Sequence, residues 1–182
     1  MFADINVRRE SAFVPEAAPS TGDDTPVYNN EELQFEAGAN EKLRIDAISG
    51  NVRVRGAETD SLVVKVTRWV RVKSPDDARL ALEALAFRRE RIDGVTHLMA
   101  NVVRDVETLG VVSYRVDLDI TCPKTSSIEL FAEDGATTIE NIEGPVRIEQ
   151  KKGPVTVASV HALDAKIEIV NNNGDVNVFN TL

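Results

Sequence analysis

Few side chains in this sequence are of the types that catalyse reactions or bind metals. The chain has one cysteine, Cys122, and two histidines, His97 and His161. A nucleophilic thiol needs a neighbouring base, and a zinc site needs several Cys or His ligands at short spacing. Neither pattern occurs, so the sequence predicts no metal site, no cofactor and no catalytic residue. Cys122 is interpreted as a small buried residue at the end of a strand.

Carboxylates are the remaining candidates for chemistry, because paired acids hydrolyse glycosidic bonds. Six of them occupy alternate, outward positions of predicted strands: Asp117, Asp119, Glu129, Glu140, Glu149 and Glu168. Outward acids also keep an acidic β protein soluble, and nothing distinguishes one pair as acid and base. We therefore predict that the protein is not an enzyme, with a carbohydrate-active enzyme as an alternative.

Charge and spacing exclude two kinds of ligand. The chain has 21 Lys+Arg against 30 Asp+Glu, a net charge of −9, whereas nucleic acid requires clustered basic residues. Calcium-binding nonapeptide repeats need paired glycines and an aspartate at a fixed phase. In this chain each repeat has a single glycine, and Glu149, Thr156 or Phe179 stands at that phase. The sequence predicts neither nucleic-acid nor calcium binding.

The elements that carry these residues are mostly strands. A stretch rich in Pro, Ala, Ser and Asp over residues 14–30 predicts a flexible N-terminal tail or linker over 1–34, followed by one domain over 35–182. Apolar and polar residues then alternate, which is typical of strands. Residues 61–73, 95–106 and 112–121 predict long strands, the last two joined as a hairpin through 107–110. Trp69 is interpreted as core or rim packing, with a ligand-stacking surface as the alternative.

One helix is predicted over residues 75–91. Ser74 can cap it, Pro75 suits its first position, and Gly94 provides a stop. The basic residues near its carboxyl end, Arg88, Arg89 and Arg91, complement the helix dipole. No run of about 18 apolar residues occurs, so we predict no transmembrane segment, and the N-terminus shows no apolar signal-peptide core.

A glycine repeat dominates the last third of the chain. Each unit has a glycine and two inward positions two residues apart, and the inward pairs begin at 128, 137, 146, 155, 167 and 176. The spacing is therefore nine residues with one interval of twelve, where His161-Ala162 would form a bulged corner. We predict an all-β fold, a single-stranded β-helix or β-solenoid of 9–12-residue strand repeats, preceded by longer strands and the helix; a β-meander is the alternative. The predicted structural corners are Gly50, Gly135, Gly144, Gly153 and Gly174.

Residues 43–179 resemble the bacterial putative-adhesin domain family. The resemblance rests on residues 49–54 (SGNVRV), on the strand 116–123 (VDLDITCP) that ends in a proline, and on the Gly-x-Val-x-Val ladder that closes at Gly174-Asp175-Val176. These family members are envelope-associated β-helical repeat proteins, similar to the head domain of putative autotransporter adhesins. The family supplies no catalytic residues.

The resemblance implies a non-catalytic, adhesin-like surface or binding module of a bacterial envelope. Its partner would be a surface ligand, glycan or protein, and its location extracytoplasmic. A self-assembling structural scaffold is the alternative, because the terminal coil of a solenoid presents unpaired backbone groups through which copies can associate.

Overall fold

The structure, a computed structural model, describes residues 26–160 and 166–179. Its strands form two sheets. The seven-stranded sheet has the spatial order β1 (Pro26–Glu36), β4 (Ser61–Val72), β7 (Val111–Pro123), β3 (Val52–Ala57), β9 (Thr137–Glu140), β11 (Val155–Ala158) and β13 (Val176–Phe179). The six-stranded sheet has the order β12 (Ile167–Asn171), β10 (Val146–Lys152), β8 (Ser127–Asp134), β2 (Lys42–Ser49), β6 (Val95–Val102) and β5 (Leu85–Ile92).

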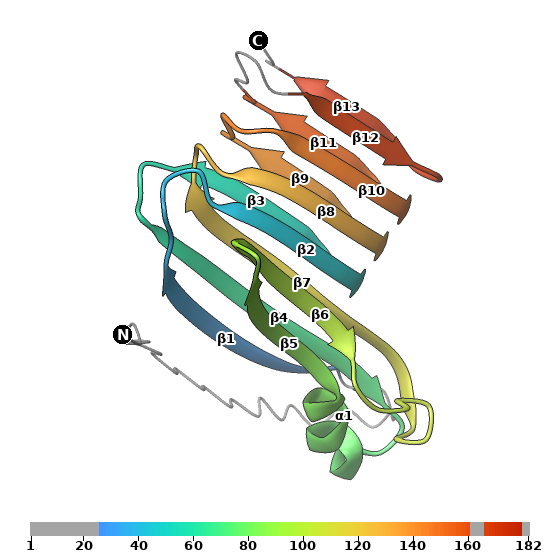
Figure 1. Cartoon of the computed structure of the whole chain (residues 1–182). Coiled ribbons are helices and arrows are strands. Elements are labelled where there is room, and N and C mark those ends of the chain that lie inside the picture. The colour runs from blue at the N-terminus through green and yellow to red at the C-terminus, as the bar shows by residue number, and fades with distance from the viewer. Residues whose placement is uncertain (1–25, 161–165, 180–182) are drawn as a thin grey trace.

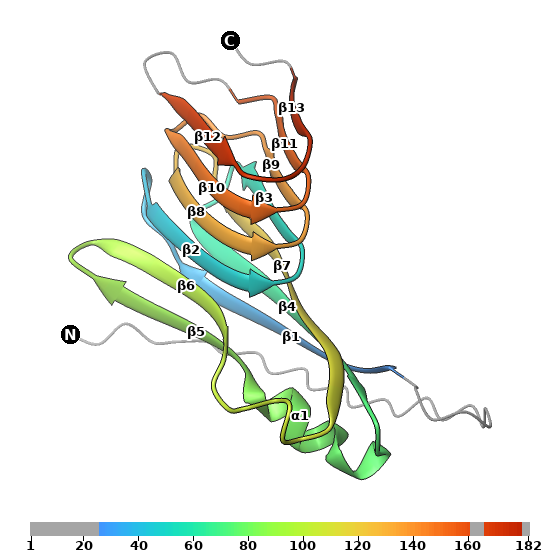
Figure 2. The same ribbon diagram turned by 90° about the vertical axis from the view of Figure 1, so that its right-hand side faces the viewer.

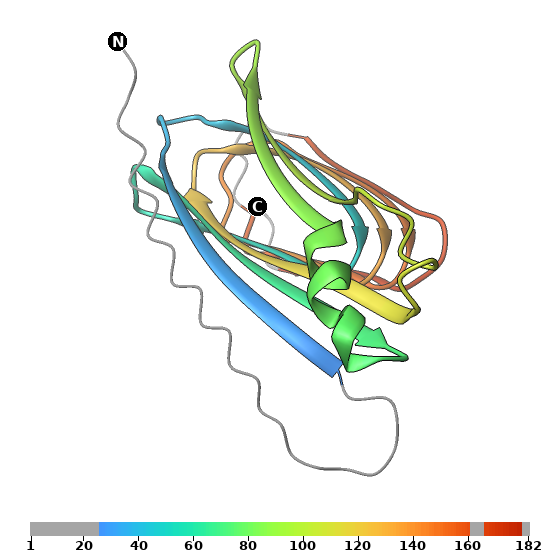
Figure 3. The same cartoon turned by 90° about the horizontal axis from the view of Figure 1, so that it is seen from below.

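The two sheets face each other, as Figures 2 and 3 show from the side and from below. Alternation along each strand sends apolar side chains between the sheets and polar ones outward. Ile45 and Leu130 of the six-stranded sheet and Val54, Val64 and Ile120 of the seven-stranded sheet are fully buried there. The core is therefore aliphatic and lies between the sheets.

The prediction of a single-stranded β-helix or β-solenoid is wrong, because the strands form two mixed sheets (Figure 1). In the seven-stranded sheet β4 pairs antiparallel with both β1 and β7, and in the other sheet β5 pairs antiparallel with β6. The long strands also do not precede the repeat as a separate block: β7 pairs with β3, and β6 pairs with β2. A nine-residue spacing reports strand length plus a turn, and it carries no information about how strands from distant parts of the chain pair.

The glycine repeat itself corresponds to strands that pass from one sheet to the other. β2, β8, β10 and β12 of the six-stranded sheet are each followed by a shorter strand of the seven-stranded sheet, namely β3, β9, β11 and β13. Parallel pairing aligns Ile128 with Val146 and Val146 with Ile167. The inward pairs of β8 to β11 are buried, whereas Val176 and Val178 of β13 are exposed.

The helix predicted over 75–91 is much shorter. A 3-10 turn η1 (Pro75–Asp77) leads into α1 (Ala78–Ala84), and β5 begins at Leu85. Phe87 and Arg89 alternate with Arg88 and Glu90, a period of two that suits a strand, and pairing with β6 decides the outcome. The basic residues assigned to a helix end therefore lie on an edge strand.

Two other boundaries differ from the sequence-based expectation. Residues 26–34, placed in the predicted tail, form most of β1 and pair with β4. Residues 107–110 do form a turn, with the Gly110 N–H bonded to the Glu107 carbonyl at 3.1 Å, but β6 and β7 belong to different sheets and make no hairpin. Residues 1–25 of the tail and the corner at His161-Ala162 lie outside the described residues.

Candidate ligand-binding groove

The structure keeps the cysteine and the described histidine apart. Cys122 points into the core from β7, where its thiol is fully buried and lies 3.9 Å from the Arg55 carbonyl oxygen. Burial raises the pKa of the Cys122 thiol to about 11, so at neutral pH the group is protonated and a poor nucleophile. His97 lies on the six-stranded sheet. Across residues 26–160 and 166–179, no group of three or more His, Cys, Asp or Glu side chains is arranged to hold a metal ion.

Four of the five predicted corner glycines form a column along the turns between the two sheets. Gly50, Gly135, Gly153 and Gly174 have φ between 110° and 143°. A Cβ on Gly135 would lie 1.9 Å from the carbonyl oxygen of Gly50, and a Cβ on Gly153 would lie 2.0 Å from that of Gly135. Gly144 lies outside the column, where a Cβ would meet the Ser126 carbonyl oxygen at 2.2 Å. These residues allow close backbone approach and contribute no side-chain chemistry.

The six outward acids are divided between the two sheets. Asp117 and Asp119 on β7 and Glu140 on β9 belong to the seven-stranded sheet, whereas Glu129, Glu149 and Glu168 lie on β8, β10 and β12 of the other. Five of them form ion pairs: Asp117 with Arg115, Glu129 with Arg44, Glu140 with Arg53, Glu149 with Arg147, and Glu168 with Lys166. The acids therefore do not gather into one site.

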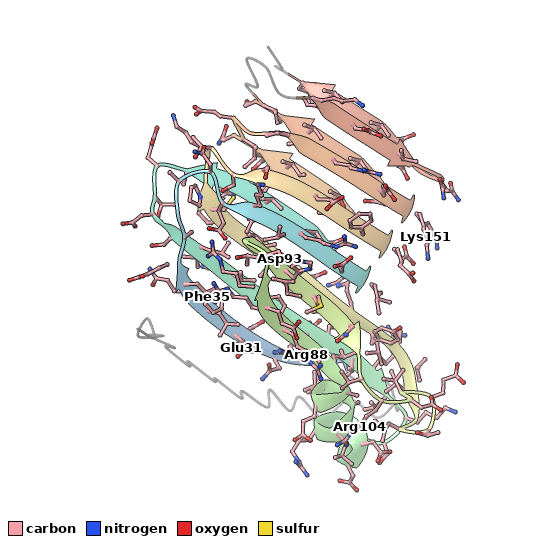
Figure 4. The ribbon with its side chains drawn as sticks, viewed as in Figure 1. Glu31, Phe35, Arg88, Asp93, Arg104 and Lys151 are labelled. Atoms are coloured by element: carbon pink, nitrogen blue, oxygen red, sulfur yellow. The ribbon has the colours of Figure 1, made fainter. Side chains whose placement is uncertain are left out.

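A shallow, open groove of about 480 Å³ crosses the six-stranded sheet. Its lining residues come from β2, β6, β8 and β10, from Val170 of β12, and from Asn172 just beyond that strand. The apolar part includes Met99, Phe131 and Val170, and the polar part includes Asp46, Asn101, Glu133, Glu149, Lys151 and Asn172. Figure 4 places Lys151 at the ends of the β8 and β10 arrows, which marks one margin of the groove.

Strand register explains why these side chains meet. Parallel pairing sets Met99 beside Asp46, Asp46 beside Phe131, Phe131 beside Glu149, and Glu149 beside Val170. Neighbouring strands lie about 4.8 Å apart, so this row crosses roughly 20 Å of sheet. Apolar and acidic side chains alternate along it, which gives the groove both contact area and hydrogen-bond acceptors.

Arginines hold the acidic side chains of the groove. The Arg44 guanidinium lies 4.5 Å from the centre of the Phe131 ring, and its Nε is 3.3 Å from Asp46 Oδ2. Arg147 pairs with Glu149, and this hydrogen bond raises the pKa of Arg147. On the adjacent row Lys166 Nζ lies 2.9 Å from Glu168 Oε2 and lowers the pKa of that carboxyl group. The groove thus presents arginine-paired carboxylates beside an aromatic ring.

Sequence reasoning identified Glu149 but not the rest of the groove. The outward faces of β6, β8 and β12 each carry one apolar residue of the groove, namely Met99, Phe131 and Val170. On that face the residues two positions before and after it are polar, while the inward positions on the same strands form the core. The signal for such a surface is an apolar residue at an outward position of a strand. Several of these residues form a site only where strand register places them side by side.

The fold and this groove define an all-β protein of two facing mixed sheets with an open groove on the six-stranded sheet. Among the described residues no helix is long and apolar enough to cross a bilayer. No family model matches the chain, and no curated protein matches it.

Several solved structures are similar to this chain. A putative cell adhesion protein from Clostridium sporogenes has a TM-score of 0.41 and 13% identity, with 84% of this chain and 100% of that chain covered. A putative adhesin from Bacteroides fragilis has a TM-score of 0.33 and 9% identity, with 82% and 96% covered. A putative lipid binding protein from Parabacteroides distasonis has a TM-score of 0.26 and 8% identity, with 84% and 74% covered.

Proposed function

We propose that this protein is a non-catalytic, adhesin-like binding module of a bacterial surface and that its ligand, a glycan or a protein segment, lies in the groove on the six-stranded sheet. The supporting observation is the row Met99–Asp46–Phe131–Glu149–Val170, which register places across one face. The volume of the groove, about 480 Å³, lies within the range of ligand sites in proteins. An open surface of this kind suits reversible binding of an extended ligand.

The side-chain arrangement favours binding over glycosidic cleavage. Cleavage requires one carboxyl group that keeps its proton and donates it to the leaving oxygen. Asp46 and Glu149 flank Phe131, yet each is paired with an arginine, Arg44 and Arg147. Such charged pairs accept hydrogen bonds from hydroxyl or amide groups of a ligand, which is what a binding module needs.

A blocked groove tests the proposal. We expect the purified protein to bind at least one member of a glycan array or of a panel of collagen, fibronectin and laminin with saturation. Val170→Lys should raise the dissociation constant of that ligand at least tenfold, because a long charged side chain fills the groove that Val170 lines. Surface plasmon resonance measures both quantities.

Val112→Lys is the matched control, because Val112 and Val170 are both 49% exposed and Val112 lies on β7 of the opposite sheet. The control should bind like the unchanged protein. Absence of saturable binding across array and panel would overturn the adhesin-like function, and equal losses in the two variants would overturn the location of the site.

Self-association is a second candidate function, favoured by the surface of the last strands. β12 and β13 are the edge strands of their sheets, and β13 exposes Val176, Val178 and Phe179. Edge strands with exposed apolar side chains pair readily with another chain. Light scattering over a concentration series should then show growth in mass that Val178→Lys abolishes; a strict monomer at high concentration contradicts this candidate.

A further inference from the structure

The outer face of the seven-stranded sheet carries an aromatic and cationic cluster far from the groove. Tyr28 of β1 lies opposite Trp69 of β4, and Trp69 lies opposite Arg115 of β7. Arg71 follows two residues after Trp69 and so projects from the same face. We call Tyr28, Trp69, Arg71 and Arg115 the aromatic–arginine cluster.

Both arginines lie against the single tryptophan of the chain. The guanidinium carbons of Arg71 and Arg115 are 5.8 and 5.7 Å from the centre of the Trp69 ring. Trp69 is half-buried, and Tyr28 is 51% exposed. Trp69 therefore does not pack in the core between the sheets. It lies on the outer face with cations beside it.

The charges of the cluster are only partly neutralised. Arg115 Nε lies 3.0 Å from Asp117 Oδ2, which leaves its terminal nitrogens for other partners. Arg71 forms no ion pair within the described part of the chain, and its Nε is buried without a hydrogen bond there. The terminal nitrogens of the two guanidinium groups offer paired donors to an anionic oxygen pair, and the groups lie beside aromatic rings that offer a flat surface to an apolar face.

We propose that the aromatic–arginine cluster binds an acidic sugar, with its carboxylate on Arg71 and Arg115 and its ring face on Tyr28 and Trp69. A sugar ring presents an apolar C–H face and an anionic group within a few ångströms, which matches the row from Tyr28 to Arg115, roughly 10 Å across three strands. The chain carries a net charge of −9, which repels an extended anionic membrane, whereas a short ligand is governed by the local cations.

Because Trp69 is the only tryptophan, its fluorescence reports on this site alone. The probes are an oligogalacturonate and its methyl ester, which share the same rings but differ in charge. We expect the free acid to change the Trp69 emission with saturation, with a dissociation constant that increases with salt, and the ester to bind at least tenfold more weakly.

Arginine variants test the assignment by calorimetry on the full chain. Arg71→Gln with Arg115→Gln should raise the dissociation constant for oligogalacturonate at least tenfold. Arg53→Gln is the charge control on the same face, because Arg53 lies outside the aromatic–arginine cluster and is paired with Glu140 at 2.9 Å. This variant should bind oligogalacturonate as tightly as the unchanged protein.

Several results would overturn the proposal: equal binding of acid and ester, an effect of Arg53→Gln as large as that of the double variant, or no response to the oligogalacturonate. Stronger binding to pentaglutamate or to vesicles that contain phosphatidylglycerol would assign the cluster to a peptide or a membrane instead. The groove variant Val170→Lys should leave oligogalacturonate binding unchanged, so this site and the groove are tested separately.

Discussion

At the scale of single residues, the thiol of Cys122 shows how burial controls reactivity and pH dependence. It is fully buried at the end of β7, and burial raises its pKa to about 11, whereas a thiol in the unfolded chain ionises near 9. The folded state therefore holds the proton more tightly. The resulting stabilisation is complete below about pH 9 and is lost as the pH rises towards 11.

We expect the free energy of unfolding to fall by roughly 2 to 3 kcal/mol between pH 9 and pH 11 because of this thiol alone. Lysines and tyrosines also titrate in this window, so the quantity to measure is the difference between the unchanged protein and Cys122→Ala. Urea unfolding at each pH gives both curves. Parallel curves for the two proteins would show that Cys122 ionises equally easily in both states.

Glu41 is the second residue whose surroundings predict a measurable effect. Its carboxylate is buried, accepts hydrogen bonds from Thr96 Oγ1 at 2.7 Å and from the Gly38 N–H at 3.2 Å, and lies 3.3 Å from the Arg91 guanidinium. It thereby joins the segment before β2 to β5 and β6. Removal of the Glu41 carboxylate leaves these donors without their acceptor.

Glu41→Ala should lower the free energy of unfolding by roughly 1 to 3 kcal/mol, because the buried Thr96 hydroxyl loses its partner. Glu83→Ala is the control: Glu83 pairs with Arg79 at 2.7 Å on the exposed surface of α1, and its loss should cost about 0.5 kcal/mol or less. Urea titrations compare the two variants. Similar small losses would mean that the Glu41 interactions contribute no more than a surface pair.

At the scale of elements, the glycine column determines how closely successive turns approach. Gly135 has φ of 136°, and a Cβ there would lie 1.9 Å from the backbone oxygen of Gly50. We expect Gly135→Ala to lower the free energy of unfolding by roughly 2 to 4 kcal/mol, from backbone strain and from separation of the turns. Thermal and urea unfolding measure this loss.

Gly38→Ala is the matched control for the column. Gly38 is not in the left-handed region, and a Cβ there would meet its nearest neighbour, Glu41 Oε2, at an ordinary 3.8 Å. Its effect should stay within about 0.5 kcal/mol. If Gly135→Ala were equally harmless, the turns would be free to separate and the corner role of these glycines would be wrong.

Individual elements differ in how far their sequence predicts them. The inward alternation of Leu43 and Ile45 and of Ile128 and Leu130 predicts strands correctly, because burial of one face imposes a period of two. The segment after Ala84 is different: Leu85–Ile92 has several good helix formers, yet it pairs with β6. Propensity is a local quantity, and strand pairing with residues 95–102 outweighs it.

At the scale of the whole molecule, the two sheets provide two opposite outer surfaces. The groove lies on the six-stranded sheet and the aromatic–arginine cluster on the seven-stranded sheet, with the aliphatic core between them. Outward side chains can vary without a change in the core, because the inward positions alone fill it. Such an arrangement allows two independent binding surfaces on one scaffold. Each surface can be tested by substitutions of its own residues.

The sequence by itself determined the local features of this protein: an all-β chain, the alternation of core and surface positions, and glycines where backbones approach. These follow from periodicity and steric limits that act within a few residues. Only the tertiary structure decided that the strands form two mixed sheets, that Arg88 to Arg91 lie on a strand, and which outward side chains meet. Pairing joins residues far apart in the chain, as when Asp46 aligns with Phe131, and no local pattern records which strands become neighbours.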